Sequence, residues 1–466
     1  MNAVVRTTLG LAAFAFTATA AIAAVPGLEQ AAGGYPVGTA ADVGALKLAV
    51  ESDPSAAVSG AQVFVAAGLS REREVQNGVA ALVAESVLRT RVDGMPLAVA
   101  VAARGGSITY AIDARTARYY LEARSADLPA VVELFGRALA APDFSPVTVD
   151  AGRVTLNARI ARDDANALDS GIQMFRRAYF TDGSRLPADG SAASLAALDP
   201  PAVRAFHAAN YVRSALTASV VGAAVPALST ALGGVATGLP DRPAEAAVPM
   251  SSPKSLPVEA PRIISHRDVG APWIVVGFGA PSPDSADFGP MLVLQALLSE
   301  SFERHSTTSL GFVERSVGTE YLYDTRPATM VLYVNGTLVD PSVAIRELLA
   351  VSSSLGKRPL TASELAAFKT AATGRFVLDS TTLADRSYRL GAFASGGLGP
   401  NGLNVVLDEI RNTTAADVKR TAAAYLGRYI VALVLPRETP AAAATPAPIR
   451  LMPIPGPRST ANPSSH

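Results

Sequence analysis

The chain has 466 residues, which is more than one hydrophobic core usually holds, so two or more domains are expected. Its 40 basic and 40 acidic residues cancel, and this balance gives no reason to expect nucleic acid or an anionic membrane surface as a partner. Cysteine is absent, which excludes disulfides, thiol nucleophiles and cysteine-based metal sites.

The N-terminus has the pattern of a secretory signal peptide. Arg6 precedes an apolar run at residues 9–24, and the small residues Ala21 and Ala23 stand just before Val25. The run is short for a membrane span, and no later segment is apolar enough for one. We therefore expect residues 1–24 to be a signal peptide and the protein to be secreted, in the periplasm; a retained N-terminal anchor is the alternative.

Hydrophobic periodicity predicts alternating elements in the first half. Residues 31–53 are Gly-rich and are expected to be irregular up to a strand near Ala45. Strands are expected at residues 62–67, 97–103, 108–112, 118–124 and 216–221, and helices at 78–90, 128–140, 147–162, 167–179 and 201–210.

The second half repeats landmarks of the first. The pattern Tyr-x-x-Asp-x-Arg occurs at residues 110–115 and again at residues 321–326. Gly68 follows the expected strand at 62–67, and Gly279 closes a similar run at the same offset. The helix and strand at residues 201–221 also resemble residues 416–435. Three landmarks in the same order indicate a duplicated unit.

Each half is therefore predicted to be an α+β domain with helices on one face of a mainly antiparallel sheet. We expect two homologous domains, at residues 40–236 and 262–436. Residues 237–261 between them are dense in Pro, Ala and Ser, which is typical of an extended linker. Residues 437–466 have the same character and are expected to be a disordered tail.

The stretch at residues 62–91 resembles the start of the insulinase, pitrilysin and mitochondrial processing peptidase family. In that family a strand ends in Gly followed by Ser and acidic residues, and a helix then begins Gly-x-Ala and carries the inverted zinc motif His-x-x-Glu-His. Here Gly68, Ser70, Arg71 and Glu72 fit the loop, and the tripeptide at residues 78–80 fits the helix start. The resemblance implies a clam-shell arrangement of the two domains.

The zinc motif itself is missing, because its positions fall on Ala81, Ala84 and Glu85. Two histidines and a glutamate would bind zinc and activate its water, and alanine does neither. Glu85 is expected to be solvated or hydrogen-bonded. The four histidines lack ligand spacing, so neither a metal nor another cofactor is expected; they are His207, His266, His305 and His466.

The resemblance also locates the family's third zinc ligand, a Glu in a downstream helix. Residues 154–166 resemble that helix and place Asn157 near the ligand position. No Glu occurs from Val154 to Ser170, and Asp163 and Asp164 are candidate replacements. An acidic pair at a helix end is more often exposed to solvent.

A second patch resembles the segment Leu-Arg-Glu-Lys-x-Gly-Leu-x-Tyr of two-chain members of the family, whose Arg and Tyr bind the substrate backbone. Arg315, Gly318 and Tyr321 fit it if one residue is deleted, whereas the Glu-Lys pair is absent. The resemblance implies substrate binding by Arg315 and Tyr321. The alternative is a surface charge and a sheet residue, because Arg104 and Tyr110 occupy the equivalent places in the first half.

These features predict a secreted non-catalytic homologue that acts as the substrate-binding and structural partner of a zinc-bearing peptidase subunit. The resemblance implies that an extended peptide substrate would add to a sheet edge between the clam-shell halves. One alternative is a non-proteolytic scaffold, like the core proteins of respiratory complexes that share this fold. Another is an active peptidase with a non-standard metal site.

The vacated motif predicts a protein without stoichiometric zinc, because tight binding needs three or four preorganised ligands. A chelator should leave the melting temperature unchanged, since a metal that does not bind cannot stabilise the folded state. The substitutions Ala81→His, Ala84→Glu and Glu85→His should not by themselves create a peptidase, because Asn157 leaves the third position unfilled. Elemental analysis that finds one zinc per chain would contradict this.

Overall fold

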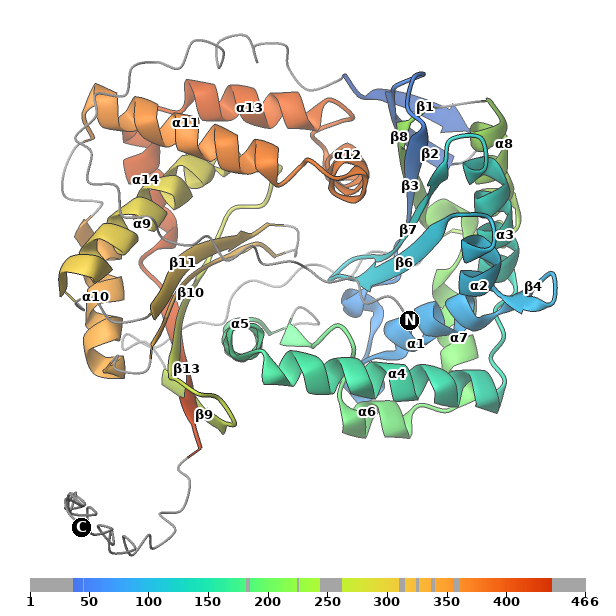
Figure 1. Ribbon diagram of the computed structural model, residues 1–466, viewed down its shortest axis with the longest axis horizontal. Coiled ribbons are helices and arrows are strands. Elements are labelled where there is room, and N and C mark those ends of the chain that lie inside the picture. The colour runs from blue at the N-terminus through green and yellow to red at the C-terminus, as the bar shows by residue number, and fades with distance from the viewer. Residues whose placement is uncertain are drawn as a thin grey trace, which may run out of the picture.

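The computed structural model describes residues 37–44, 46–181, 185–223, 226–243, 262–309, 315–323, 327–336, 340–354 and 360–437. The expected signal peptide, most of the expected linker and nearly all of the expected tail lie outside the described residues. Two α/β halves face one another, each built on one main sheet (Figure 1). None of the described helices is both long enough and apolar enough to span a bilayer.

The first half holds a six-stranded sheet in the order β1-β2-β8-β3-β7-β6. Its central strands β3 and β8 are almost continuously buried, which suits their runs of apolar and β-branched residues. All neighbours are antiparallel except β2 and β8. The strands are β1 (Thr39–Val43), β2 (Leu46–Ser52), β3 (Val58–Val65), β6 (Ser107–Ile112), β7 (Ala117–Arg124) and β8 (Leu216–Gly222).

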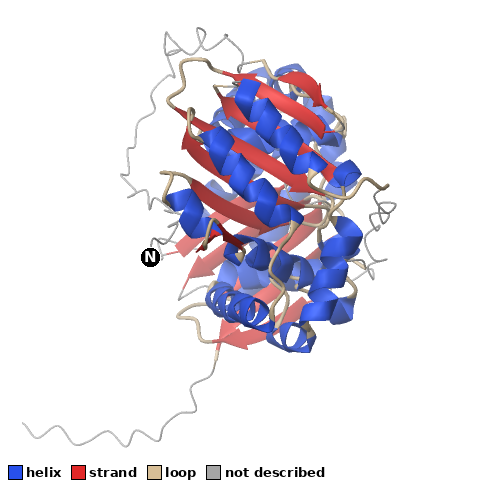
Figure 2. Cartoon of the chain, turned by 90° about the vertical axis from the view of Figure 1, so that its right-hand side faces the viewer, coloured by secondary structure: helices blue, strands red, loops and turns tan. Residues whose placement is uncertain are grey.

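Helices cover one face of this sheet and form the larger hydrophobic core with it (Figure 2). A small hairpin, β4 (Arg91–Val92) and β5 (Met95–Pro96), leads into them. The helices of this half are α1 (Val79–Arg89), α2 (Leu97–Ala102), α3 (Leu128–Ala140), α4 (Pro146–Ala165), α5 (Ala167–Tyr179), α6 (Ala192–Ala197), α7 (Pro200–Asn210) and α8 (Pro226–Thr237).

The predicted strand at residues 97–103 is wrong, because this segment forms α2. Leu97, Ala100 and Val101 are fully buried, which is the i, i+3, i+4 spacing of a helical face, whereas Val99 is exposed. A short apolar run of this length does not distinguish strand from helix by periodicity alone. Strand β1 also lies within the segment that was expected to be irregular.

The second half repeats this topology in a five-stranded sheet of order β11-β12-β10-β13-β9. Strands β9, β13, β10, β12 and β11 correspond in order to β2, β8, β3, β7 and β6, and β9 and β13 form the parallel pair. The predicted fold class of two homologous α+β domains is therefore confirmed. The strands are β9 (Arg262–Arg267), β10 (Trp273–Gly279), β11 (Arg315–Leu322), β12 (Thr329–Gly336) and β13 (Tyr429–Pro436).

A second hydrophobic core lies between this sheet and its own helices. The longest of them, α9, runs across the middle of the layer and contacts the other four helices that cover this face. The helices of this half are α9 (Phe288–Ser309), α10 (Pro341–Ser354), α11 (Ala362–Leu378), α12 (Leu383–Gly396), α13 (Gly402–Asn412) and α14 (Ala415–Tyr425).

Two helices are exchanged between the halves. Helix α5 of the first half packs on β10 and β13, and α12 of the second half packs on β2, β3 and β8. Figure 1 shows both helices nearly end-on, each beside the sheet of the other half. Each sheet is therefore covered by its own helices on one face and by one helix of the other half on the opposite face.

The α5 contact is apolar. Ile172, Phe175, Tyr179 and Phe180 form a separate core with Val275 and other residues of the second sheet. Gly277 and Gly279 allow this close approach, because a Cβ at either position would collide with the ring of Phe175 or the hydroxyl of Tyr179. The sequence of β10 is therefore fitted to a helix that comes from the other half.

The α12 contact combines a small apolar cluster, which includes Leu390 and Val221, with polar contacts. Arg386 forms an ion pair with Glu51, which is buried in β2. Ser219 donates a 2.6 Å hydrogen bond to the Ser387 carbonyl, and Gln62 donates a 3.1 Å bond to the Ala384 carbonyl. Directional bonds thus supplement apolar packing at α12, whereas the α5 contact depends on close apolar packing.

We expect Gly277→Val to lower the free energy of unfolding by about 1–3 kcal/mol, because the new side chain overlaps the Phe175 ring in a packed interface. Gly374→Ala is the matched control. Its site in α11 is open, and alanine favours a helix interior over glycine by about 0.5–1 kcal/mol. Urea unfolding should show opposite signs for the two variants; equal effects would contradict the interlocked packing.

Candidate functional site

The vacated motif lies on the inner face of helix α1. The helix follows Gly78, which has a positive φ of 94°. Ala81, Ala84 and Glu85 are all buried, and α1 approaches α4 closely where Gly152 lies beside Glu85. The predicted helix that carries the motif positions is therefore present, and all three positions on it are buried.

Glu85 is hydrogen-bonded on both carboxylate oxygens. Its Oε2 accepts from Arg89, one turn further along α1. Its Oε1 accepts from the Tyr110 hydroxyl at 2.8 Å and from Nη2 of Arg159 at 3.1 Å. Of the two alternatives expected for Glu85, the structure shows the hydrogen-bonded one. Burial and the Glu85 charge raise the pKa of Tyr110 well above its usual range, so the phenol keeps the proton that it donates.

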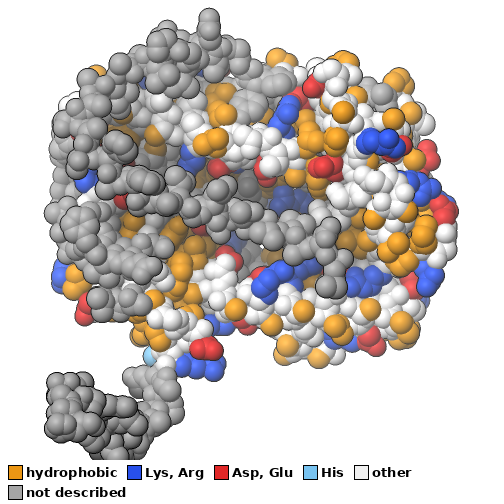
Figure 3. Space-filling view, viewed as in Figure 1, with side chains coloured by type: hydrophobic (Ala, Val, Ile, Leu, Met, Phe, Trp, Pro, Cys, Tyr) orange, Lys and Arg blue, Asp and Glu red, His pale blue; other side chains and the backbone are white. Residues whose placement is uncertain are grey.

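Arg159 extends this cluster to a second carboxylate. Its Nη1 lies 3.1 Å from Oδ1 of Asp189, and its guanidinium carbon lies 5.0 Å from the centre of the Tyr110 ring. Arg89 also donates to the hydroxyl of Thr155 at 2.7 Å. Burial raises the pKa of Asp189, which the Arg159 charge opposes. Figure 3 shows basic side chains gathered above α4, near the middle of the molecule.

This set of side chains does not fit a zinc ion. Alanines provide no ligand, and Glu85, the one carboxylate at the motif positions, already accepts hydrogen bonds from two guanidinium groups and a phenol. A guanidinium stays protonated and has no lone pair for a metal. Among the residues that the structure describes, no group of three His, Asp or Glu side chains could hold a metal ion.

The downstream residues are not brought together with the motif as ligands. Asn157 lies on α4, and its buried Oδ1 has no hydrogen-bond partner among the described residues. Asp164 pairs with Arg267 of β9 at 3.0 Å, and Asp163 lies 3.6 Å from Arg162. Both aspartates are therefore engaged at the surface.

Tyr321 lies on β11, facing the helices of its own half. It is buried, its hydroxyl donates to the Pro281 carbonyl, and its ring packs against Phe288 at 5.6 Å. Burial raises its pKa well above the usual range. Arg315 begins β11, and its side chain lies outside the described part of the chain. Substrate binding by the pair stays a prediction.

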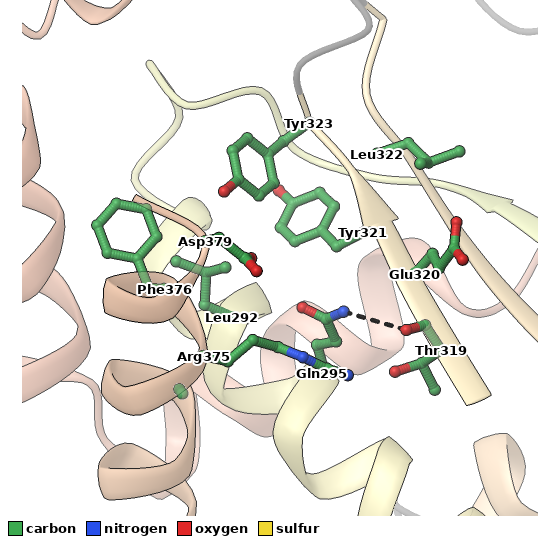
Figure 4. A pocket seen from close by; sticks show the side chains of 11 residues that line it. Leu292, Gln295, Thr319, Glu320, Tyr321, Leu322, Tyr323, Arg375, Phe376 and Asp379 are labelled. Carbon is green, nitrogen blue, oxygen red and sulfur yellow. Dashed lines mark hydrogen bonds between the residues drawn. The ribbon is translucent and has the colours of Figure 1, made fainter. Parts of the chain in front are cut away.

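A cavity of about 270 Å³ opens beside Tyr321, between β11 and α11 (Figure 4). Arg375 and Asp379 reach it from successive turns of α11, and Gln295 faces it from α9. Burial raises the pKa of Asp379, opposed by the charge of Arg389. Arg375 and Asp379 were not among the predicted site residues, because no helix was predicted in this segment and their i, i+4 spacing is the one signal that the sequence offers.

Glu72 caps the helix that carries the vacated motif. Its carboxylate accepts from the backbone amides of Gly78 at 3.0 Å and Ala80 at 2.9 Å, and from Asn77 Nδ2 at 2.8 Å. These are the donors that a helix N-terminus leaves without partners. Burial nevertheless outweighs these bonds and raises the pKa of Glu72 to about 7.

A family model described as Insulinase (Peptidase family M16) matches residues 47–184, a range that includes α1, α4 and the vacated positions. No curated protein sequence matches the chain. Several solved structures match the chain. Because their sequence identities are low, they establish similarity of fold alone.

Three of these structures cover most of the chain. A peptidase M16 inactive domain from Pseudomonas fluorescens is 17% identical, with a TM-score of 0.75 over 86% of this chain and 98% of that one. A protease from Helicobacter pylori is 16% identical, with a TM-score of 0.74 over 86% of this chain and 100% of that one. A chain of complex III2 from Candida albicans, determined with Inz-5 bound, is 13% identical, with a TM-score of 0.69 over 84% of this chain and 93% of that one.

The raised pKa of Glu72 predicts a loss of stability as the pH rises from about 4.5 to about 7. In this window the folded state keeps a proton that the unfolded chain has released, so unfolding becomes easier by up to about 3 kcal/mol. Urea unfolding between pH 4 and pH 8 should show this loss in the wild type and not in Glu72→Gln.

The comparison with Glu72→Gln isolates this group from His207, whose burial lowers its pKa and whose effect has the opposite sign. Parallel pH profiles for wild type and variant would show that Glu72 does not titrate in this window.

Proposed function

We propose that this chain is an insulinase-type homologue, of peptidase family M16, with a degenerate zinc motif, and that it acts as the non-catalytic, substrate-binding and structural partner of a zinc-bearing peptidase subunit. The carrying observation is the cluster around Glu85. Two alanines and a carboxylate engaged by Arg89, Arg159 and Tyr110 leave no ligand set for the metal on which the family's chemistry depends.

The strand edges support a peptide as the ligand. Among the described residues, β6 pairs only with β7, and β11 pairs only with β12. Each therefore has one row of backbone N–H and C=O groups without a strand partner, to which an extended peptide can add. The edge of β6 borders the Glu85 cluster through Tyr110.

We further propose that the protein is secreted, in the periplasm, and meets its partner there. The basis is the signal-peptide pattern of residues 1–24. In this proposal Arg315 and Tyr321 of β11 contact the substrate backbone, and a guanidinium and a phenol suit this role because both donate hydrogen bonds to carbonyl oxygens.

A non-proteolytic scaffold is the second candidate. It is favoured by one observation, the engagement of the Tyr321 hydroxyl with the Pro281 carbonyl inside the second half. Because this hydroxyl already donates to a carbonyl of its own half, Tyr321 has a structural role that does not require a bound substrate. The likeness to a chain of complex III2 is compatible with this candidate.

Affinity capture from the native host should recover a chain with an intact His-x-x-Glu-His motif in a stable complex. Arg315→Ala and Tyr321→Phe should then lower peptide cleavage by the complex while assembly stays intact, with Tyr429→Phe on β13 as the matched control. A scaffold predicts no change in cleavage. Recovery of a lone monomer would contradict the proposed partnership.

A further inference from the structure

Arg159 connects α1 and α4. The resemblance places a zinc ion between α1 and the downstream helix in the family, and in this chain a guanidinium links the two corresponding helices. It comes from α4 and contacts Glu85 of α1 at 3.1 Å. The same group contacts Asp189 at 3.1 Å. One cation therefore bridges two carboxylates, as a metal ion would.

The side chain of Arg159 is more exposed than the two carboxylates that it contacts. The side chain of Arg159 is 28% exposed, whereas those of Glu85 and Asp189 are 4% and 13% exposed. A guanidinium group also has more N–H donors than these two carboxylates use. Its five donors also exceed the three partners Glu85, Asp189 and Tyr110, so a donor remains for an acceptor that approaches from solvent.

The open strand edge is next to this group. The Arg159 guanidinium lies over the ring of Tyr110, which belongs to the edge strand β6. A peptide that added to β6 would run past Tyr110 and bring its carbonyl oxygens close to Arg159. The register of such a peptide follows from the backbone of β6.

The charges of the cluster indicate which ligand fits. Glu85 and Asp189 balance Arg89 and Arg159, so the cluster carries no net charge when all four are ionised. A neutral backbone carbonyl suits such a site better than a phosphate or a carboxylate. A guanidinium can donate to this carbonyl but cannot bind and activate water, so the peptide is held and not cleaved.

We propose that Arg159 replaces the metal ion in this chain, as the bridge between α1 and α4 and as the donor that binds a backbone carbonyl of an extended peptide on β6. This inference rests on the proposed peptide-binding role, but it concerns the isolated chain and needs no second subunit.

The test is binding of fluorescein-labelled casein peptides to the full chain, measured by fluorescence anisotropy. Arg159→Gln should weaken binding about tenfold or more, the usual effect of losing a hydrogen bond from a charged donor. Arg162→Gln, one turn away on α4 and 75% exposed, is the matched control and should change affinity less than about twofold.

Arg159→Lys is included because Arg159→Gln could fail to fold. Lysine keeps a positive charge beside Glu85 and Asp189 and removes only the planar set of guanidinium donors. It should still weaken binding several-fold. In the wild type, bound peptide should slow amide exchange in residues 107–112. Unchanged affinity in folded Arg159→Lys and Arg159→Gln, protection of β11 in place of β6, or no binding by the wild type would each overturn the inference.

These outcomes are separate from those of the partnership test. A chain that binds peptide through Arg159 but is captured without a peptidase subunit would retain this inference and lose the proposed partner role. Capture with a peptidase subunit, together with peptide binding that does not depend on Arg159, would support the partner role and overturn this inference.

Discussion

The structure depends on the exchange of α5 and α12 between its two halves. A sheet with one bare apolar face is unstable in water, and here each half covers that face of the other. Each half has its own core between its sheet and its helices, whereas the opposite face of each sheet is covered only when the two halves are together. The exchange also explains glycines at 277 and 279, where any side chain would block α5.

The cluster around Glu85 follows from the same close packing. A buried carboxylate is costly unless each oxygen is hydrogen-bonded, and removing one member of a buried pair leaves an uncompensated charge. Glu85 meets this requirement with Arg89, Arg159 and Tyr110, which come from α1, α4 and β6. Three elements are thus tied together at the place where the family resemblance puts a metal.

Much of the fold was predictable because it depends on periodicity and local chemistry. The duplicated α+β halves, α1 and its vacated motif could be read from the sequence, whereas α2 could not, since its short apolar run suits either structure. The amphipathic pattern of α5 predicts burial but not against which sheet. Likewise nothing in the sequence pairs Arg159 with Glu85, because 74 residues separate them.

Two residues in the stretch that resembles the peptidase family have structural roles in this chain. Gly78 precedes α1 with a positive φ, which glycine adopts more easily than other residues. The carboxylate of Glu72 accepts hydrogen bonds from backbone amides at the start of that helix. Both residues therefore help to position the first turn of α1. Ala81 and Ala84, at the vacated motif positions, are fully buried in the core of the first half, so they contribute packing and no metal ligand.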